Sequence, residues 1–312
     1  MPERFEVGMP DGVRLHVEAT GPADAQVTAV LLHGWTLDGR AWHRQVEALA
    51  ADGAVRVVTY DARGHGRSSC MELPTATLAQ LGDDLAAVLD TVAPTGRVVL
   101  VGHSLGGMTI MEYAHRHPAH FAARTAGLVF VSTTAEGHTH TAYGLSPRIT
   151  RLIRLAETTG AGVLARCGSW RAPRALLRAL QPSIRWMLFG DRCEPADIRL
   201  VTSAVARASL RSIGGFRASI GAQHRLDTLA ALAHLPAAAL VGDRDRLTPP
   251  PCAESIAAAL PATELTVCPG AGHMLMMERA DEVNSALTGV LRRVLAGGPS
   301  PTRGATPAGA GA

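Results

Sequence analysis

The sequence predicts an α/β fold, in which helices cover both faces of a mostly parallel sheet. Short apolar runs without polar alternation recur along the chain, as expected for strands that are buried on both faces. These runs alternate with segments whose apolar residues have helical spacing. With 312 residues, of which 47% are hydrophobic, the chain is long enough to bury a large core.

The first part of the chain supplies most of the predicted strands. Residues 5–19 alternate around the turn Pro10-Asp11-Gly12 and predict a β-hairpin. Further strands are expected at 27–32, 55–60, 98–101 and 127–131. Helices are expected at 41–50, 77–92 and 105–117, the last ending before Pro118.

After Ser132 the pattern changes. Residues 135–228 contain helix-like stretches broken by glycine and proline, and strands resume at 237–241 and 264–267 before a helix at 280–295. We therefore expect an α/β core of residues 1–134 and 229–296 and a helical insertion of residues 135–228. The insertion is expected to form a cap over the carboxyl ends of the strands, where open α/β sheets bind ligands. Residues 297–312 have the composition of a disordered tail.

Composition excludes several classes of function. All 30 basic residues are arginine and the net charge is +3, so no nucleic-acid partner is expected. The five cysteines form no C-x-x-C pair, which favours a reduced, cytoplasmic setting. No signal peptide is predicted, because the N-terminus has no apolar h-region, and no transmembrane segment is predicted, because no stretch reaches 18 apolar residues. The histidines have no ligand set around them, so we expect no metal and no cofactor. The oligomeric state is left open.

A G-x-S-x-G motif lies between a predicted strand and a predicted helix. The run Val98–Val101 leads into Gly102-His103-Ser104-Leu105-Gly106. A sharp turn from strand to helix forces its corner residue into a strained conformation, and side chains two residues away on either side would clash. The glycines therefore predict that Ser104 is held at the top of the sheet, near the positive end of the helix.

Four short motifs, each after a predicted strand, follow one another along the chain. They are His33-Gly34-Trp35, Gly102-His103-Ser104-Leu105-Gly106-Gly107, Gly242-Asp243-Arg244-Asp245 and Gly270-Ala271-Gly272-His273. With them, nearly the whole chain except its tail resembles an α/β-hydrolase-fold enzyme, in which nucleophile, acid and histidine occur in this order.

The chemistry assigns a role to each candidate. A serine hydroxyl needs a base, and His273 is suited to take the proton of Ser104. The imidazole needs a carboxylate, for which Asp243 and Asp245 are both close in sequence. The family pattern places the acid three residues after the glycine that ends the strand, which selects Asp245. An oxyanion needs two backbone N–H donors. Leu105 is expected to supply one, and the resemblance implies that Trp35 supplies the other.

The identity of the nucleophile restricts the type of reaction that is expected. Haloalkane dehalogenases and epoxide hydrolases of this fold place aspartate at the elbow, whereas this chain has Ser104. The resemblance thus implies acyl transfer, with a carboxylic ester of a small to medium, apolar molecule as the expected substrate. A thioesterase, a lactonase or a biosynthetic hydrolase or cyclase would use the same residues. A non-catalytic ligand-binding protein is the alternative from another class.

The insertion supplies further candidates. It holds 14 arginines against six acids, and Arg148, Arg151 and Arg154 fall at helical spacing beside apolar residues. This pattern is typical of a helix that meets anionic lipid or an acidic partner, but also of a solvated helix face, which we favour. The expected pocket residues, with core packing as their alternative, are Trp35, His103, Trp170, Trp186, Phe189 and Met274.

Overall fold

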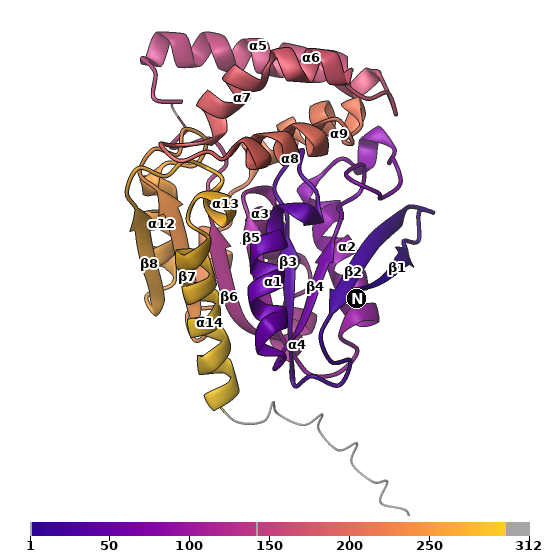
Figure 1. Ribbon diagram of the computed structural model, residues 1–312, viewed down its shortest axis with the longest axis vertical. Coiled ribbons are helices and arrows are strands. Elements are labelled where there is room, and N and C mark those ends of the chain that lie inside the picture. The colour runs from indigo at the N-terminus through magenta and orange to yellow at the C-terminus, as the bar shows by residue number, and fades with distance from the viewer. Residues whose placement is uncertain (1, 142, 298–312) are drawn as a thin grey trace, which may run out of the picture.

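An eight-stranded sheet forms the centre of the molecule (Figure 1). The computed structural model describes residues 2–141 and 143–297; the predicted tail, apart from residue 297, lies outside the described residues. The strand order is β1-β2-β4-β3-β5-β6-β7-β8, with β1, β2 and β4 paired antiparallel and the other pairs parallel. The strands are β1 (Glu3–Gly8), β2 (Arg14–Thr20), β3 (Val27–Leu32), β4 (Arg56–Tyr60), β5 (Arg97–His103), β6 (Thr125–Val131), β7 (Ala237–Gly242) and β8 (Thr263–Cys268).

The apolar runs of the sequence become the inner strands. Every residue of β3 and β7 is buried, as expected for parallel strands with helices on both faces. Alternate residues feed the two cores: Val30 packs on one side of the sheet and Leu31 on the other. The last strand, β8, is mostly exposed because it pairs with β7 alone at the sheet edge.

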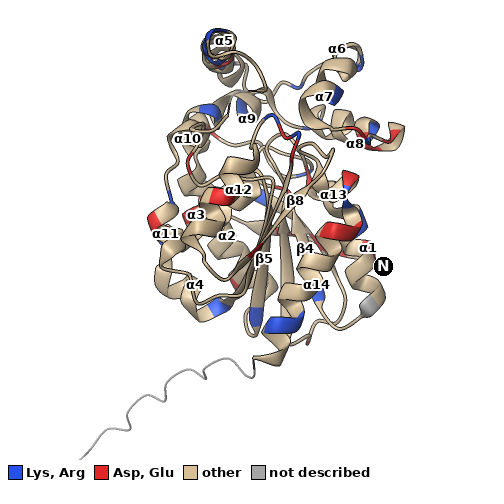
Figure 2. Ribbon diagram, turned by 90° about the vertical axis from the view of Figure 1, so that its left-hand side faces the viewer, with Lys and Arg blue, Asp and Glu red and all other residues tan. Residues whose placement is uncertain are grey.

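Helices cover both faces of the sheet. Figure 2 shows α1 and α14 on one side and α2, α3, α4, α11 and α12 on the other, in agreement with the two hydrophobic cores. The helices outside the insertion are α1 (His43–Asp52), α2 (Leu78–Val92), α3 (Leu105–Arg116), α4 (Pro118–Arg124), α12 (Pro250–Ala259), α13 (Leu275–Glu278) and α14 (Ala280–Ala296), with the 3-10 helices η1 (Gly39–Trp42) and η2 (Leu73–Thr75).

Between β6 and β7 the described chain forms helices, and its one β-type pairing there is an isolated bridge between Arg171 and Ser209. The helices are α5 (Pro147–Arg166), α6 (Arg174–Ala179), α7 (Gln181–Leu188), α8 (Pro195–Val205), α9 (Leu210–Gly215), α10 (Arg217–Ala222) and α11 (Leu226–Ala230). Helices α5 to α9 lie beyond one end of the sheet (Figure 1). Ser104 lies at the carboxyl end of β5. The insertion is attached to the loops at the carboxyl ends of β3 and β4: the backbone N–H of Ser209 donates to the carbonyl of Gly64, and the indole of Trp35 donates to the carbonyl of Ser212.

Candidate active site

Ser104 occupies a sharp turn between β5 and α3. Its backbone has φ 51° and ψ −116°, a conformation that L-residues rarely adopt. A Cβ atom on Gly102 would lie 2.4 Å from the backbone nitrogen of Gly107, and one on Gly106 would lie 2.2 Å from the carbonyl oxygen of Leu32. Only glycine therefore fits at these two positions, as the sequence motif predicts.

Strained backbone gathers around this turn. The non-glycine residues with positive φ in the described chain are Thr36, Ser104, Ser132 and Tyr143. Thr36 follows the His33-Gly34-Trp35 motif, Ser132 follows β6, and Tyr143 lines the same cavity as Ser104. Strain of this kind costs about 1–3 kcal/mol per residue and clusters at functional sites. Its distribution marks this end of the sheet as the candidate site.

His273 and Asp245 form a buried hydrogen-bonded pair. Nδ1 of His273 lies 2.8 Å from Oδ2 of Asp245. The same carboxylate accepts the Thr248 hydroxyl at 2.8 Å and the backbone N–H groups of Leu247 and Thr248 at 2.9 Å each. Burial alone would raise the pKa of Asp245, but the imidazole and these donors outweigh it and hold that pKa below its usual range. Asp245 is thereby kept ionised.

Asp243 has a different environment. It is exposed, and its Oδ1 accepts the backbone N–H of Gly270 at 2.7 Å. The carboxylate that meets His273 is therefore Asp245, the residue that the sequence motif favoured. Asp243 instead stabilises the turn that precedes the histidine.

His103 connects the pair to the elbow. Its Nε2 lies 3.0 Å from the carbonyl oxygen of His273, and the two rings have their centroids 4.7 Å apart. Burial, then the neighbouring His273, lowers the pKa of His103 well below its usual value, so the ring is neutral. Since His103 adjoins Ser104 in the chain, this contact places the His273 loop beside the nucleophile turn. His103 does not line the cavity, contrary to the prediction.

The backbone N–H groups of Trp35 and Leu105 have no acceptor within the described residues. Both residues line the cavity with Ser104. The loop that carries Trp35 is held by His33, whose Nε2 accepts the N–H of Ala62 at 2.9 Å while Nδ1 lies 2.8 Å from the carbonyl of Gly34. Unpaired N–H donors beside a serine are the requirement for oxyanion binding.

The cavity at Ser104 has a volume of about 290 Å³ and is lined from both the core and the insertion. Apolar side chains from the core and from α5, α9 and α10 cover most of it: Trp35, Leu105, Met108, Ala161, Leu164, Ile213, Ile220 and Leu247. Gly160, inside α5, also lines it, and a Cβ atom there would meet no atom within 4 Å. The cavity is thus mainly apolar and has unfilled space.

Four more of the predicted pocket residues do not line this cavity. Trp170 is 77% exposed, and Trp186 is 44% exposed with the guanidinium of Arg246 stacked 4.7 Å from its ring. Phe189 and Met274 are buried in the core on the α14 side of the sheet. The predictions rested on apolar character, which does not distinguish a cavity lining from the core, where Phe189 and Met274 pack, or from an exposed surface, where Trp170 and Trp186 lie.

The polar groups that do line the cavity were missed. His138, Tyr143, Glu157 and Arg217 come from separate segments of the insertion, and no motif joins them. One signal was available: Glu157 is the only acid in residues 147–190, a stretch rich in arginine. A single acid in such a segment is expected to have a specific partner, and here it is Arg217.

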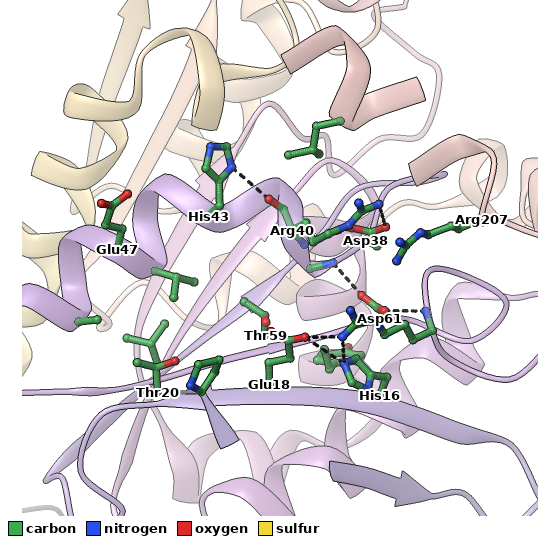
Figure 3. Close-up of a pocket in the computed structure, with 18 residues that line it drawn as sticks. His16, Glu18, Thr20, Asp38, Arg40, His43, Glu47, Thr59, Asp61 and Arg207 are labelled. Carbon is green, nitrogen blue, oxygen red and sulfur yellow. Dashed lines mark hydrogen bonds and ion pairs between the residues drawn. The ribbon is translucent and has the colours of Figure 1, made fainter. Parts of the chain in front are cut away.

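A larger cavity, of about 500 Å³, lies between β2, β4, α1 and α8 and shares no lining residue with the Ser104 cavity (Figure 3). Three of its carboxylates have partners within it. Asp38 forms a two-pronged pair with Arg40, Asp61 accepts the backbone N–H groups of Gly39 and Arg67, and Glu18 pairs with Arg67. These contacts hold the loops after β3 and β4.

In residues 2–141 and 143–297, no three His, Cys, Asp or Glu side chains come together as a metal-ligand set. None of the helices in these residues has the length and apolar character needed to cross a bilayer.

Comparison with known proteins identifies the family. The family model described as alpha/beta hydrolase family matches residues 29–286. The "Putative carbamate hydrolase RutD" of Variovorax paradoxus is 33% identical over 290 residues, 91% of this chain and 98% of the relative. Epoxide hydrolase B of Mycobacterium tuberculosis is 37% identical over 128 residues, 40% of this chain and 34% of the relative. A thermophilic esterase from Thermogutta terrifontis has a TM-score of 0.74 and 27% identity, covering 94% of this chain and 99% of the esterase. The chain therefore belongs to the alpha/beta hydrolase family and is a hydrolase.

Proposed function

We propose that this hydrolase cleaves carboxylic esters through an acyl-enzyme, with Ser104 as nucleophile, His273 as base and Asp245 as the carboxylate that orients the histidine. The observation that carries the proposal is the buried His273–Asp245 hydrogen bond of 2.8 Å beside a serine in a strained turn. This arrangement supplies what an unactivated hydroxyl lacks: a base in a fixed tautomer.

The geometry of the His273–Asp245 pair decides which imidazole nitrogen accepts the proton of Ser104. Asp245 holds Nδ1–H of His273, so Nε2 is the basic nitrogen. As Ser104 Oγ attacks the ester carbonyl carbon, Nε2 takes the hydroxyl proton, and the N–H groups of Trp35 and Leu105 bind the resulting oxyanion. Collapse expels the alcohol, which takes the proton from the imidazolium. Water then attacks the acyl-enzyme by the same steps and releases the acid.

The cavity supports a small to medium acyl substrate, since its volume is about 290 Å³ and its lining is mainly apolar. Residues 135–228 supply part of that lining, so we assign them the role of a cap on the core of residues 1–134 and 229–296. A cap limits the access of bulk water to the site and so strengthens the electrostatic interactions within it.

The test is hydrolysis of p-nitrophenyl esters with acyl chains from C2 to C16 by wild type and Ser104→Ala. We expect turnover with an optimum at about eight carbons or fewer, set by the cavity volume, and loss of that turnover in the variant. A fluorophosphonate should label the wild type at Ser104 and leave the variant unlabelled. A folded wild type that neither labels nor turns over any ester would overturn the proposal and favour a ligand-binding protein.

A carbamate is the second candidate substrate, because the relative matched over 98% of its length is named as a carbamate hydrolase. Its carbonyl would be attacked by the same serine. Phenyl carbamate against phenyl acetate separates the two candidates: a higher kcat/KM for the carbamate would favour it. Thioesters and lactones belong to the same chemical class and can be compared in the same assay.

A further inference from the structure

One wall of the Ser104 cavity is charged although the rest is mainly apolar. Its three central residues come from separate parts of the insertion: Tyr143 precedes α5, Glu157 lies in α5, and Arg217 begins α10. We call Tyr143, Glu157 and Arg217 the polar wall. Arg217 is buried, whereas Glu157 is partly exposed, and placing a buried guanidinium beside a hydrophobic cavity costs free energy, so the presence of the pair there calls for a physical reason.

Within the polar wall, one carboxylate oxygen receives both internal hydrogen bonds. Glu157 Oε2 accepts the Tyr143 hydroxyl at 2.7 Å and Nη2 of Arg217 at 2.5 Å. Glu157 Oε1 and Arg217 Nη1 have no partner within the described residues, and neither belongs to the buried side-chain atoms that lack one. One accessible acceptor and one accessible donor therefore remain on the two members of this ion pair.

Within the polar wall, the negative charge of Glu157 is balanced by the positive charge of Arg217. Burial raises the pKa of Tyr143 to about 12, so its hydroxyl remains a donor. His138 also lines the cavity, and burial, together with Arg217 and Arg154, lowers its pKa to about 4, so that it is neutral. The nearby Arg154 does not line this cavity and donates to the backbone carbonyls of His138 and Thr141. The backbone of Tyr143 has φ 55°, a strained conformation maintained at this wall.

We infer that the polar wall binds a neutral group of the substrate that both donates and accepts hydrogen bonds, of the carboxamide or ureide type. Its N–H would donate to Glu157 Oε1 and its carbonyl would accept from Arg217 Nη1. A carboxylate would be repelled by Glu157, and an ammonium would be repelled by Arg217. An alkyl end would leave Glu157 Oε1 and Arg217 Nη1 without a hydrogen-bond partner when it displaces water from them. This inference rests on the proposed function, because it describes the acyl substrate of the same serine.

The experiment uses p-nitrophenyl esters of straight-chain acids that differ only in the far end: carboxamide, methyl, carboxylate or ammonium. Each is made with two to five methylene groups, so that the distance from Ser104 to the polar wall is sampled. We expect the best carboxamide ester to exceed its methyl, carboxylate and ammonium counterparts by about tenfold or more in kcat/KM, mostly through KM. Equal or lower kcat/KM for the carboxamide at every length would overturn the inference.

Variants separate binding from a structural role. Glu157→Gln should raise kcat/KM for the carboxylate ester relative to the ammonium ester, and Arg217→Gln should change that ratio in the opposite direction. Tyr143→Phe, which removes a hydroxyl but no charge, is the matched control and should leave the ratio near the wild-type value. If the variants change all four esters by the same factor, the polar wall only holds the insertion together and the inference is wrong.

The two proposals fail separately. Turnover of the methyl esters that depends on Ser104, without any preference among the four ends, would retain the esterase and reject the inference. For an enzyme that turns over none of the esters, calorimetry on Ser104→Ala with hexanamide and with hexanoate tests the polar wall alone. Tighter binding of hexanamide supports the inference, and equal or tighter binding of hexanoate rejects it.

Discussion

Asp245 has four hydrogen-bonding contacts, counting His273, Thr248 and two backbone N–H groups, whereas the Asp243 carboxylate accepts one backbone N–H. Asp245→Asn should therefore lower kcat by about three to four orders of magnitude, because the wrong imidazole tautomer is stabilised. Asp243→Asn should lower it much less. Initial rates on the best p-nitrophenyl ester measure both, and the opposite ranking would assign the acid to Asp243.

At the scale of residues, the sequence predicts those parts of the site whose geometry depends on a few consecutive residues. Gly102 and Gly106 flank Ser104 because a strand-to-helix turn leaves no room for Cβ atoms, and such a constraint is visible in five residues. The polar wall has no such signature. Tyr143, Glu157 and Arg217 meet only when the insertion folds, so spacing in the sequence carries no trace of their contact.

At the scale of elements, the loop after β4 is tied to α2 by a buried ion pair. Arg63 donates from Nε and Nη2 to the two oxygens of Asp84, both at 2.6 Å, and the side chains are 0% and 1% exposed. Asp84→Asn should lower the free energy of unfolding by about 3 kcal/mol, because it leaves a fully buried guanidinium with only the partly exposed Asp11, 2.7 Å from Nη1, as its counter-charge.

The neighbouring Asp83 offers a matched control. It pairs with Arg116, but those side chains are 32% and 40% exposed, so Asp83→Asn should cost about 1 kcal/mol or less. Urea unfolding of both variants measures the difference. Similar losses in the two variants would mean that burial does not set the strength of the Arg63–Asp84 pair.

Helix α5 shows what the sequence pattern missed at this scale. Arg148 and Arg151 are exposed, but Arg154 turns inward and donates to the carbonyls of His138 and Thr141. Leu152 and Leu155 are 67% and 65% exposed, so apolar residues face outward on this helix. Helical spacing identifies which residues share a face, but the direction in which that face points depends on the helices packed beside it.

At the scale of the whole molecule, buried histidines couple stability to pH. Burial lowers the pKa of His65 to about 3, that of His138 to about 4, and that of His103 well below its usual value. Between about pH 6.5 and pH 4 the unfolded chain therefore binds protons that the folded chain does not. Stability should fall as pH falls, by up to about 1.4 kcal/mol per pH unit for each histidine.

Urea unfolding at several values between pH 7 and pH 4.5 measures this dependence. His138→Gln removes one of the three groups and should make the slope shallower. A free energy of unfolding that stays constant over this range would show that the three rings take up protons in the folded chain as they do in the unfolded chain, and would contradict the lowered pKa values.

The strand order is the part of the global architecture that the sequence left open. The apolar runs located β3, β4 and β5, but nothing in them places β3 between the other two. That arrangement follows from the handedness of the crossover connections and from which strand can join the antiparallel pair β1–β2. Such rules concern how strands are arranged in the complete sheet, so the residues of a single strand do not reveal its position.

Gly160 has a consequence for how this enzyme can change over evolution. Glycine inside a helix costs roughly 0.5–1 kcal/mol relative to alanine, and here no neighbouring atom requires it, since a Cβ would enter open space in the cavity. We therefore expect Gly160→Ala to stabilise α5 and to reduce the space in the cavity. Under the proposed function, one substitution here would exchange room for the acyl chain against helix stability, so that substrate size could change while Ser104, Asp245 and His273 stay the same.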